Sequence, residues 1–205
     1  MLEAIRTHLP AVRRISSYCL PRNLKKKSQQ EIDELAAAGL SMVYVGAESG
    51  DDAVLAAVSK GETFDSTVDA LNKLGAAGIS RSVMILNGLG GRELSRQHAA
   101  NSARLANATQ PEYLATLVVS FPKGEQRLRA GFPGWEALTQ PELFAEMETF
   151  LSGLELKRTV FRSDHASNWL VLKGTLGADK ERLLAQVRQA IAGEAPLRPA
   201  WARGL

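Results

Sequence analysis

The fold of this chain is decided by the stretch Val43-Tyr-Val-Gly-Ala-Glu-Ser-Gly-Asp-Asp-Ala-Val-Leu-Ala-Ala-Val-Ser-Lys-Gly61. It begins with a short apolar run, passes through a polar turn that contains Glu48, and changes to a helical pattern that Asp51 or Asp52 opens. This order predicts a buried strand, a tight turn and a short helix. Turns of this kind, after the carboxyl ends of parallel strands, are where α/β proteins bind ligands. The stretch alone leaves two readings open for Glu48, a ligand-facing carboxylate and a solvated loop residue.

Strands and helices alternate in the same way from residue 12 to about residue 154. Between the strands, apolar positions recur at helical spacing, and Ser28 with Glu31 predicts a capping box at one helix start. Such alternation is typical of a parallel sheet with crossover helices, so we expect an α/β protein. Besides the opening run, strands are expected at residues 12–18, 82–86 and 113–119.

The length of the chain limits the architecture. A closed barrel of eight βα units takes about 250 residues, and this chain has 205. We therefore expect residues 1–155 to form an incomplete parallel (βα) barrel-like sheet of about four strands. Residues 156–205 are expected to form a small C-terminal α+β extension that ends in a helix and a frayed tail. An open sheet has two edges, which other elements or another chain must cover.

Composition argues against several classes of protein. The chain is 45% hydrophobic and 23% charged, as globular domains are, and its net charge of +3 makes it only mildly basic. The basic runs Arg13-Arg14 and Lys25-Lys26-Lys27 contain no interleaved aromatic residues, so nucleic acid is not an expected partner. No apolar run approaches the roughly 20 residues of a membrane helix, and residues 1–6 lack the apolar core of a signal peptide. We therefore expect a cytoplasmic protein without a membrane partner.

The cysteine and the histidines limit the metal and redox chemistry. The single cysteine, Cys19, excludes a disulfide within the chain and cannot form a thiolate metal site alone. His8 and His98 lie in expected helices without a second ligand at metal spacing. His165 lies in the polar hexapeptide Ser163-Asp-His-Ala-Ser-Asn168, which is either a turn held by its own side chains or part of a site. We assign no metal ligand and no catalytic residue from spacing.

Three candidate binding features belong to one end of the predicted sheet. The Glu48 carboxylate could accept hydrogen bonds from an amine or from ribose hydroxyls. The run Gly88-Leu-Gly-Gly91 could let backbone groups approach a nucleotide-like ligand, although it lacks the G-x-G-x-x-G spacing and equally fits a plain turn. Lys60, beyond the short helix, could bind a carboxylate.

Together these residues resemble the later half of a radical S-adenosylmethionine (SAM) domain. The resemblance rests on Val45-Gly-Ala-Glu-Ser-Gly-Asp-Asp-Ala-Val-Leu55 with Lys60-Gly61, and on Met84-Ile-Leu-Asn-Gly-Leu-Gly-Gly91. The stretch Phe161-Arg-Ser-Asp-His-Ala-Ser-Asn-Trp-Leu-Val-Leu-Lys-Gly-Thr-Leu176 is similar to the C-terminal segment of bacterial radical SAM proteins of the oxygen-independent coproporphyrinogen oxidase and Elongator-type groups. The resemblance implies a partial βα barrel, like a TIM barrel that is not closed, with SAM lying across the carboxyl ends of the strands.

The resemblance also implies roles for residues in SAM binding. Glu48 and Ser49 would face the ribose or the methionine part of SAM. Lys60 matches the position where related enzymes place a basic residue toward the SAM carboxylate. Gly88 and Gly90 would let backbone groups contact the adenine.

A second group of residues is assigned to the substrate side or to structure. Arg22 follows a proline where relatives often have Pro-Arg after an acidic strand residue, but here Tyr18 stands in the acidic position. His165, Ser167 and Asn168 would line the substrate site or lock the tail onto the barrel.

The sequence departs from the family pattern in one decisive respect. Radical SAM enzymes carry a 4Fe-4S cluster on a Cys-x-x-x-Cys-x-x-Cys loop, and no such loop is present in these 205 residues. Thiolates hold such clusters, and one cysteine cannot replace three. SAM and a 4Fe-4S cluster are thus the cofactors that the resemblance implies for the family, whereas no cluster is expected on this chain.

The family reaction is cleavage of SAM by the cluster to a 5′-deoxyadenosyl radical that abstracts hydrogen from a substrate. We expect this chain to be a truncated radical SAM-like protein, inactive alone, that lacks an N-terminal half or a partner chain and whose substrate is unknown. The alternatives are a degenerate, non-catalytic binding module that docks on a partner, and a generic α/β hydrolase or transferase, for which no nucleophile elbow or triad is visible.

Overall fold

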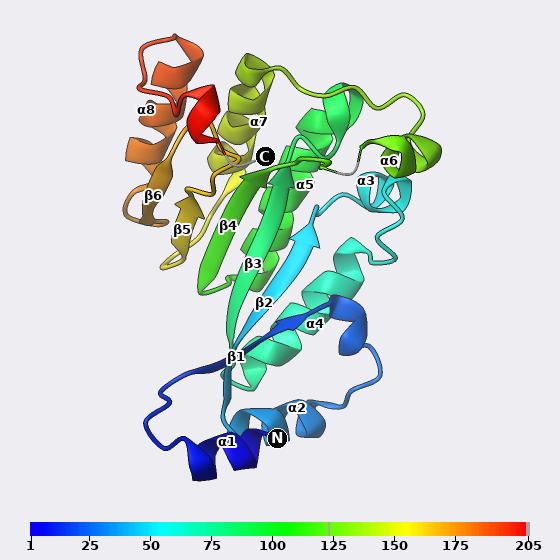
Figure 1. Ribbon diagram of the computed structural model, residues 1–205, viewed down its shortest axis with the longest axis vertical. Helices are drawn as coiled ribbons and strands as arrows, with labels where there is room; N and C mark the ends of the chain where they lie inside the picture. Colours follow the sequence, from blue (N-terminus) through cyan, green and yellow to red (C-terminus); the bar gives the residue numbers. More distant parts are fainter. Residues whose placement is uncertain (123, 204–205) are drawn as a thin grey trace.

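The computed structural model describes residues 1–122 and 124–203, in which helices and strands alternate along the chain (Figure 1). The elements are α1 (Leu2–His8), β1 (Ile15–Cys19), the 3-10 helix η1 (Pro21–Asn23), α2 (Gln29–Ala37), β2 (Leu40–Glu48), α3 (Asp52–Ala57), α4 (Phe64–Ala76), β3 (Ser80–Asn87), α5 (Gly91–Thr109), β4 (Tyr113–Val118), α6 (Gln126–Gly131), α7 (Gln140–Gly153), β5 (Val160–Ser163), β6 (Leu172–Thr175), α8 (Lys180–Ile191) and the 3-10 helix η2 (Ala200–Ala202).

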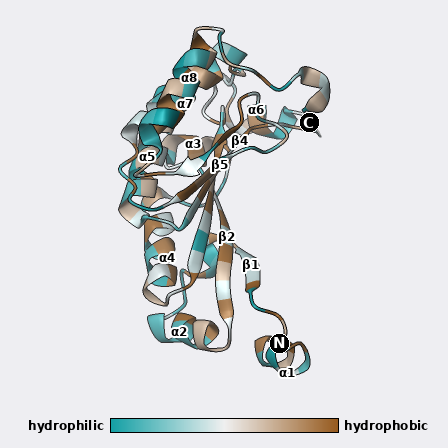
Figure 2. Cartoon of the chain, turned by 90° about the vertical axis from the view of Figure 1, so that its left-hand side faces the viewer, coloured by the Kyte–Doolittle hydropathy of each residue, from teal (hydrophilic) through white to brown (hydrophobic). Residues whose placement is uncertain are grey.

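In the described part of the chain, six strands form a single sheet in the order β1-β2-β3-β4-β5-β6. The first five strands run parallel, and β6 pairs antiparallel with β5. Helices α2, α4, α5 and α7 lie on one face of this sheet, as the side view in Figure 2 shows. Because the strand order does not return to β1, the sheet is an open part of a barrel, with the carboxyl ends of all parallel strands at one edge.

The hydrophobic core lies between the sheet and these helices. Every second residue of β2 and β3 faces the helices and is buried, because successive side chains of a strand point to opposite faces. The strand side of this core consists of Val43, Val45, Ala47, Val83, Ile85 and Leu114. The helix side includes Leu71, Leu105, Phe150 and Leu151. Burial of these side chains is the main source of stability of the fold.

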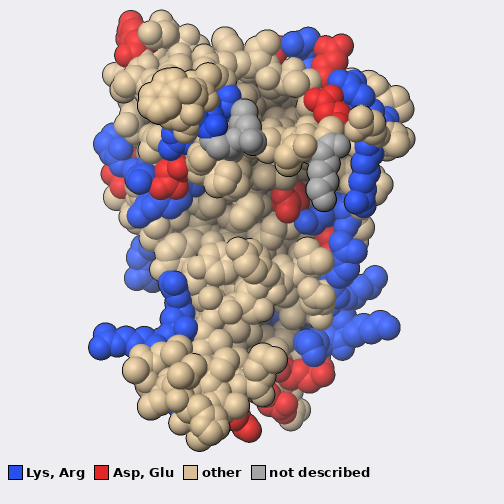
Figure 3. All heavy atoms as spheres, in the orientation of Figure 1, with Lys and Arg blue, Asp and Glu red and all other residues tan. Residues whose placement is uncertain are grey.

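The opposite face of the sheet is different, because no helix of the described residues lies over its centre (Figures 1 and 2). Tyr18 and Tyr44 are register partners on this face, with ring centroids 5.4 Å apart, and Tyr18 is 84% exposed. Figure 3 looks onto this uncovered face and shows a largely uncharged surface with Lys and Arg side chains on its flanks. In a complete barrel this face would line the interior.

The expectation of an α/β fold with an incomplete parallel barrel is confirmed, but the sheet has six strands rather than about four. The C-terminal segment supplies the two additional strands, since β5 pairs with β4 and β6 pairs with β5. Each of these strands has four residues, which is too short for an alternating pattern to identify them. The two strands within residues 156–205 therefore continue the sheet.

The expected frayed tail also differs from the structure, up to Arg203. Arg198 donates hydrogen bonds to the carbonyls of Asp164, His165 and Asn168. Arg203 donates to the carbonyl of Ser167 and lies over the ring of Trp169, 3.7 Å from its centroid. These contacts fasten the tail to the hexapeptide between β5 and β6. Residues 204 and 205, also part of the expected tail, lie outside the described residues.

Over residues 1–122 and 124–203, none of the helices combines the length and the apolar character that crossing a bilayer requires.

A buried arginine joins three elements at the amino end of β3. Arg81 is 7% exposed and pairs with Glu112, with Nη2 2.8 Å from one carboxylate oxygen and Nε 3.0 Å from the other. Its guanidinium also donates to the carbonyls of Leu71 in α4 and Thr109 in α5. A single side chain thus donates to carbonyls of two helices, α4 and α5.

We expect Arg81→Ala to lower the free energy of unfolding by about 3 kcal/mol, because it leaves buried carbonyls and the Glu112 carboxylate without their donor. Urea unfolding followed by circular dichroism measures this loss. Arg96→Ala, which removes an exposed arginine from α5, is the control and should change stability by less than about 0.5 kcal/mol. Equal effects of the two substitutions would contradict this role for Arg81.

Candidate functional site

Two turns at the carboxyl edge of the sheet form the candidate site. The first follows β2 and contains residues 48–51, and the second follows β3 and contains residues 88–91. We call them the β2 turn and the β3 turn. Since β2 and β3 are neighbouring parallel strands, the two turns lie side by side above α5. The prediction that both turns lie at the same end of the sheet is confirmed.

The carboxylate of Glu48 lies beside the ammonium of Lys60, with Oε1 3.1 Å from Nζ. Both side chains are partly buried, at 21% and 15% exposed. Glu48 has φ +66°, a conformation that non-glycine residues seldom adopt, and it breaks the register between β2 and β3. A Cβ at Gly46 would lie 2.3 Å from the Glu48 carboxylate, so the glycine makes room for this carboxylate to fold back over the strand.

A hollow lies in front of this ion pair. It is lined by the end of β1 and by the uncovered face of β2 and β3, with Tyr18, Tyr44, Glu48 and Met84 among its residues. The hollow therefore combines aromatic and thioether side chains with one carboxylate. A ligand bound there would contact an apolar wall and a charged rim.

Arg22 occupies the neighbouring loop, but its guanidinium has protein partners. Its Nε lies 2.9 Å from the Glu62 carboxylate, whose side chain is 2% exposed, and its Nη2 donates to the Lys60 carbonyl at 2.7 Å. Arg22 thus holds the loop that presents Lys60. Contact of Arg22 with a substrate stays a prediction.

The hydroxyl of Ser49 lies on the other side of the β2 turn, against α5. Ser49 is fully buried, its Oγ lies 2.7 Å from His98 Nδ1, and it accepts a hydrogen bond from Asp51 N–H. Leu86 supplies the other contact of the imidazole, since its carbonyl lies 3.1 Å from His98 Nε2. Ser49 thus points toward α5, whereas Glu48 lines the hollow, and contact of Ser49 with a ligand stays a prediction.

Asp51 closes the β2 turn and begins α3. Its carboxylate accepts hydrogen bonds from Val54 N–H and from the side chains of Gln97 and Asn101 on α5. Burial raises the pKa of this carboxyl, but the hydrogen bonds from Val54, Asn101 and Gln97 outweigh it and hold the pKa below its usual value. Of the two predicted helix-opening aspartates, Asp51 is the cap.

The β3 turn is shaped by close packing around its glycines. Gly88 has φ +83° and Gly91 has φ +59°, which glycine adopts without strain. A Cβ at Gly91 would lie 2.7 Å from the ring of Trp135, and one at Gly90 would lie 3.1 Å from His98 Cβ. Conformation and packing thus account for these glycines. Contact of Gly88 or Gly90 with a ligand stays a prediction.

Glu146, on α7, lies beneath the β3 turn and was not expected from the sequence. Its Oε1 accepts the Gly88 N–H at 2.6 Å, and the Ser95 hydroxyl donates to its Oε2 at 2.5 Å. Burial raises the pKa of Glu146 to about 7, although the hydrogen bonds from Ser95 and Gly88 oppose the shift. Burial likewise lowers the pKa of His98 to about 4, so this imidazole is neutral at physiological pH.

Two features of the sequence could have identified these buried polar residues. Ser95, His98 and Ser102 recur at helical spacing on the face of α5 that carries Ala99 and Ala103. Glu146 interrupts the apolar stripe of α7. A polar residue in an apolar stripe indicates a buried hydrogen-bonded group.

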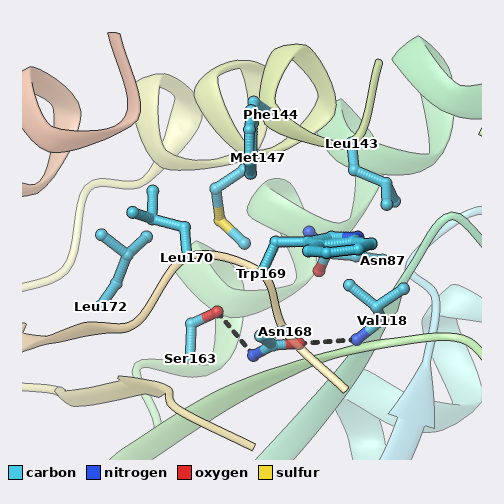
Figure 4. A pocket seen from close by; sticks show the side chains of 10 residues that line it. All are labelled: Asn87, Val118, Leu143, Phe144, Met147, Ser163, Asn168, Trp169, Leu170 and Leu172. Carbon is cyan, nitrogen blue, oxygen red and sulfur yellow. Dashed lines mark hydrogen bonds between the residues drawn. The ribbon is translucent and has the colours of Figure 1, made fainter. Parts of the chain in front are cut away.

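The hexapeptide between β5 and β6 is a turn held by its own side chains. His165 Nδ1 lies 2.9 Å from Ser167 Oγ, and the amide of Asn168 bonds to Val118 N–H, the Thr116 carbonyl and Ser163 Oγ. Figure 4 shows Asn168 between Ser163 and Val118, beside the ring of Trp169. Through Asn168 this turn is tied to β4 and β5, and contact of His165, Ser167 or Asn168 with a substrate stays a prediction.

In the described residues, no group of three or more His, Cys, Asp and Glu side chains is arranged to hold a metal ion.

Gly50 fixes the distance between the β2 turn and α5. Its N–H donates to Ser102 Oγ at 2.9 Å, and a Cβ at this position would lie 2.3 Å from the backbone carbonyl of Asn101. We expect Gly50→Ala to lower the free energy of unfolding by about 2 kcal/mol, because the turn must move away from α5. Gly134→Ala is the matched control, since its nearest atom would be 3.7 Å away, and it should be nearly neutral in the same urea titration. A neutral Gly50→Ala would show that the turn is free to move.

Comparisons with known proteins give one family match and several structural neighbours. A family model for the radical SAM superfamily matches residues 1–106. Among solved structures, the archaeal Methanocaldococcus infernus Elp3 with an N-terminal deletion is similar with a TM-score of 0.57 at 14% identity, over 89% of this chain and 43% of that chain. Methylornithine synthase (PylB) gives 0.47 at 15% identity, over 96% and 62%. The radical SAM methyltransferase TsrM from Kitasatospora setae gives 0.44 at 22% identity, over 56% and 22%.

No curated protein matches the chain. The chain spans less than half of the Elp3 structure, and at this identity the likeness concerns the fold.

Proposed function

This chain belongs to the radical SAM superfamily, and on that premise we propose that the carboxyl ends of β2 and β3 form part of a SAM-binding site. The observation that carries the proposal is the partly buried pair of Glu48 and Lys60, 3.1 Å apart at the rim of a hollow. SAM has an α-carboxylate, an α-amine, ribose hydroxyls and an adenine. An ammonium and a carboxylate held side by side match the charges of an amino acid.

The chemistry of each residue assigns it a part of SAM. Lys60 binds the α-carboxylate, and Glu48 accepts hydrogen bonds from the α-amine or from the ribose hydroxyls. By resemblance to the family, the backbone of Gly88 and Gly90 contacts the adenine. The hydroxyl of Ser49 supports the β2 turn from below instead of touching SAM.

The residues of this chain do not fit a 4Fe-4S cluster. Cysteine thiolates hold such clusters, and the sequence contains Cys19 alone. Burial, and then the nearby Glu62 carboxylate, raise the pKa of the Cys19 thiol, which disfavours the thiolate that iron needs. We therefore propose that this chain holds no cluster and is inactive alone.

The cluster ligands would then come from residues outside these 205, on an N-terminal half or on a partner chain. In the family, SAM and the cluster together supply a 5′-deoxyadenosyl radical that abstracts hydrogen from a substrate. The share of this chain in that chemistry is to bind and orient SAM.

A second function, a non-catalytic binding module, is favoured by the outer edge of the sheet. Within the described residues β1 pairs with β2 alone, so the backbone groups of its other edge are available to a further strand. Tyr18 is exposed on the same strand. A partner that adds a strand to β1 would extend the barrel and cover this residue.

The SAM proposal is tested by equilibrium dialysis of the chain against labelled SAM. We expect Glu48→Gln to weaken binding about tenfold, because a neutral amide loses a charge-assisted hydrogen bond. Glu155→Gln, at an exposed position far along the chain, is the charge-matched control and should leave the affinity unchanged. Equal affinities of the two variants would remove Glu48 from the site, and no binding by the unmodified chain would contradict the proposal that this chain binds SAM.

Inactivity is tested by anaerobic reconstitution of the chain with iron, sulfide and SAM. We expect no cluster absorbance and no 5′-deoxyadenosine, since three thiolates are missing. Appearance of both would overturn the proposal that this chain is inactive alone.

A further inference from the structure

Two sets of buried hydrogen bonds lie beneath the turns of the proposed site, and a contact between His98 and Glu146 brings them together. The imidazole of His98 contacts the β2 turn through Ser49 Oγ at 2.7 Å and the end of β3 through the Leu86 carbonyl at 3.1 Å. Because a carbonyl only accepts, Nε2 carries the proton and Nδ1 accepts the Ser49 hydroxyl. Both ring nitrogens of the neutral imidazole are thereby satisfied.

Glu146 forms the second set, at the β3 turn. One carboxyl oxygen accepts the Gly88 N–H at 2.6 Å and lies 4.0 Å from His98 Nε2, and the other accepts from Ser95 at 2.5 Å. The distance to His98 would suit an ion pair, but the imidazole is neutral and its Nε2–H points to Leu86. The contact is therefore between a titrating carboxyl and a polar neutral ring.

We propose that Glu146 is a positioning residue for the SAM site, which sets the β3 turn through the Gly88 amide and couples it to the β2 turn through His98 and Ser49. This inference rests on the proposed function for the identity of the ligand. The coupling itself rests on the contacts described above. No atom of Glu146 is required to touch SAM.

The protonation state of Glu146 changes both contacts. An ionised carboxylate makes a charge-assisted and therefore stronger bond to the Gly88 N–H. It also places a negative charge 4.0 Å from His98 Nε2, which polarises the ring and its bond to Ser49. Since its pKa is about 7, both states are populated near neutral pH.

The charged groups around Glu146 do not titrate in the same range. His98 has a pKa of about 4 and stays neutral, and Glu142, one turn away on α7, has a pKa of about 2 and stays ionised. The pKa of Asp51, which faces His98, is lowered, and that of Arg92, bound to Glu142, is raised. Glu146 is thus the group of this set whose charge changes between pH 6 and pH 8.

Amide nuclear magnetic resonance of the full chain between pH 5.5 and 8.5, without ligand, tests the coupling. We expect the Gly88 amide proton to move downfield as the pH rises through about 7, and the amides of Ser49 and Gly50 to titrate with the same midpoint. Glu146→Gln should abolish both titrations while keeping the fold, because its amide accepts from Gly88 and donates to Ser95. Glu148→Gln on the same helix, which removes a carboxylate paired with Arg188, should keep both.

The outcomes separate this inference from the SAM assignment. Three results would overturn the coupling. The Gly88 amide shift could titrate while the amides of Ser49 and Gly50 do not, none of these amides could titrate, or the titration could survive Glu146→Gln. SAM affinity is then compared at pH 6 and pH 8, where we expect about threefold tighter binding at pH 8 for Glu148→Gln and no such difference for Glu146→Gln. If no variant binds SAM but both turns titrate together, the coupling stands and the proposed function fails.

Discussion

The bond between the Ser49 hydroxyl and the His98 imidazole, fully buried and 2.7 Å long, holds the carboxyl end of β2 on α5. A buried polar group that lost such a bond would carry its whole desolvation cost, so the turn and the helix must stay in contact. At the same junction Gly50 packs against the backbone of α5, where the space is too small for a side chain. The position of Glu48 at the rim follows from this junction, because Glu48 is the residue directly before the anchored serine.

The site is thus built in two layers that use neighbouring residues of the same turn. The upper layer contains Glu48 with Lys60 and faces the hollow. The lower layer contains Ser49, His98 and Glu146 and is closed to solvent. Because one face of the open sheet is uncovered, no elements of the described residues pack against the upper layer from that face. The lower layer supports it from the helices, and this explains why polar groups are buried there at a cost in free energy.

Sequence reasoning was reliable where the determinants are local. The capping box of Ser28 and Glu31 forms as expected, because both partners lie within one helical turn. The β2 turn and its helix were predicted from a single stretch for the same reason. The pairing of β5 with β4 depends on residues 47 positions apart in the chain, as in the register pair Tyr113 and Val160, and four-residue strands carry too little pattern to reveal it.

For the site, residue types and strand exits were sufficient to bring Glu48, Lys60 and Gly88 to one edge, but not to orient their neighbours. The side of the turn on which Ser49 lies depends on the bulge at Glu48. Arg22 forms an ion pair with Glu62, which is 40 positions away in the chain, so the local sequence pattern does not predict it. His98 and Glu146 lie on different helices, and only the packing of α5 on α7 brings them together.

The bare edge of β1 has a consequence for how the chain behaves in solution. The strand Ile15–Cys19 contains neither proline nor a charged residue, and among the described residues no further strand pairs with its outer edge. Natural sheets protect such edges with charges, prolines or covering segments, and here the nearest charges are Arg13 and Arg14, before the strand begins. At high concentration the β1 edges of two copies can pair with each other. We therefore expect the isolated chain to self-associate when it is concentrated and to dissociate when it is diluted.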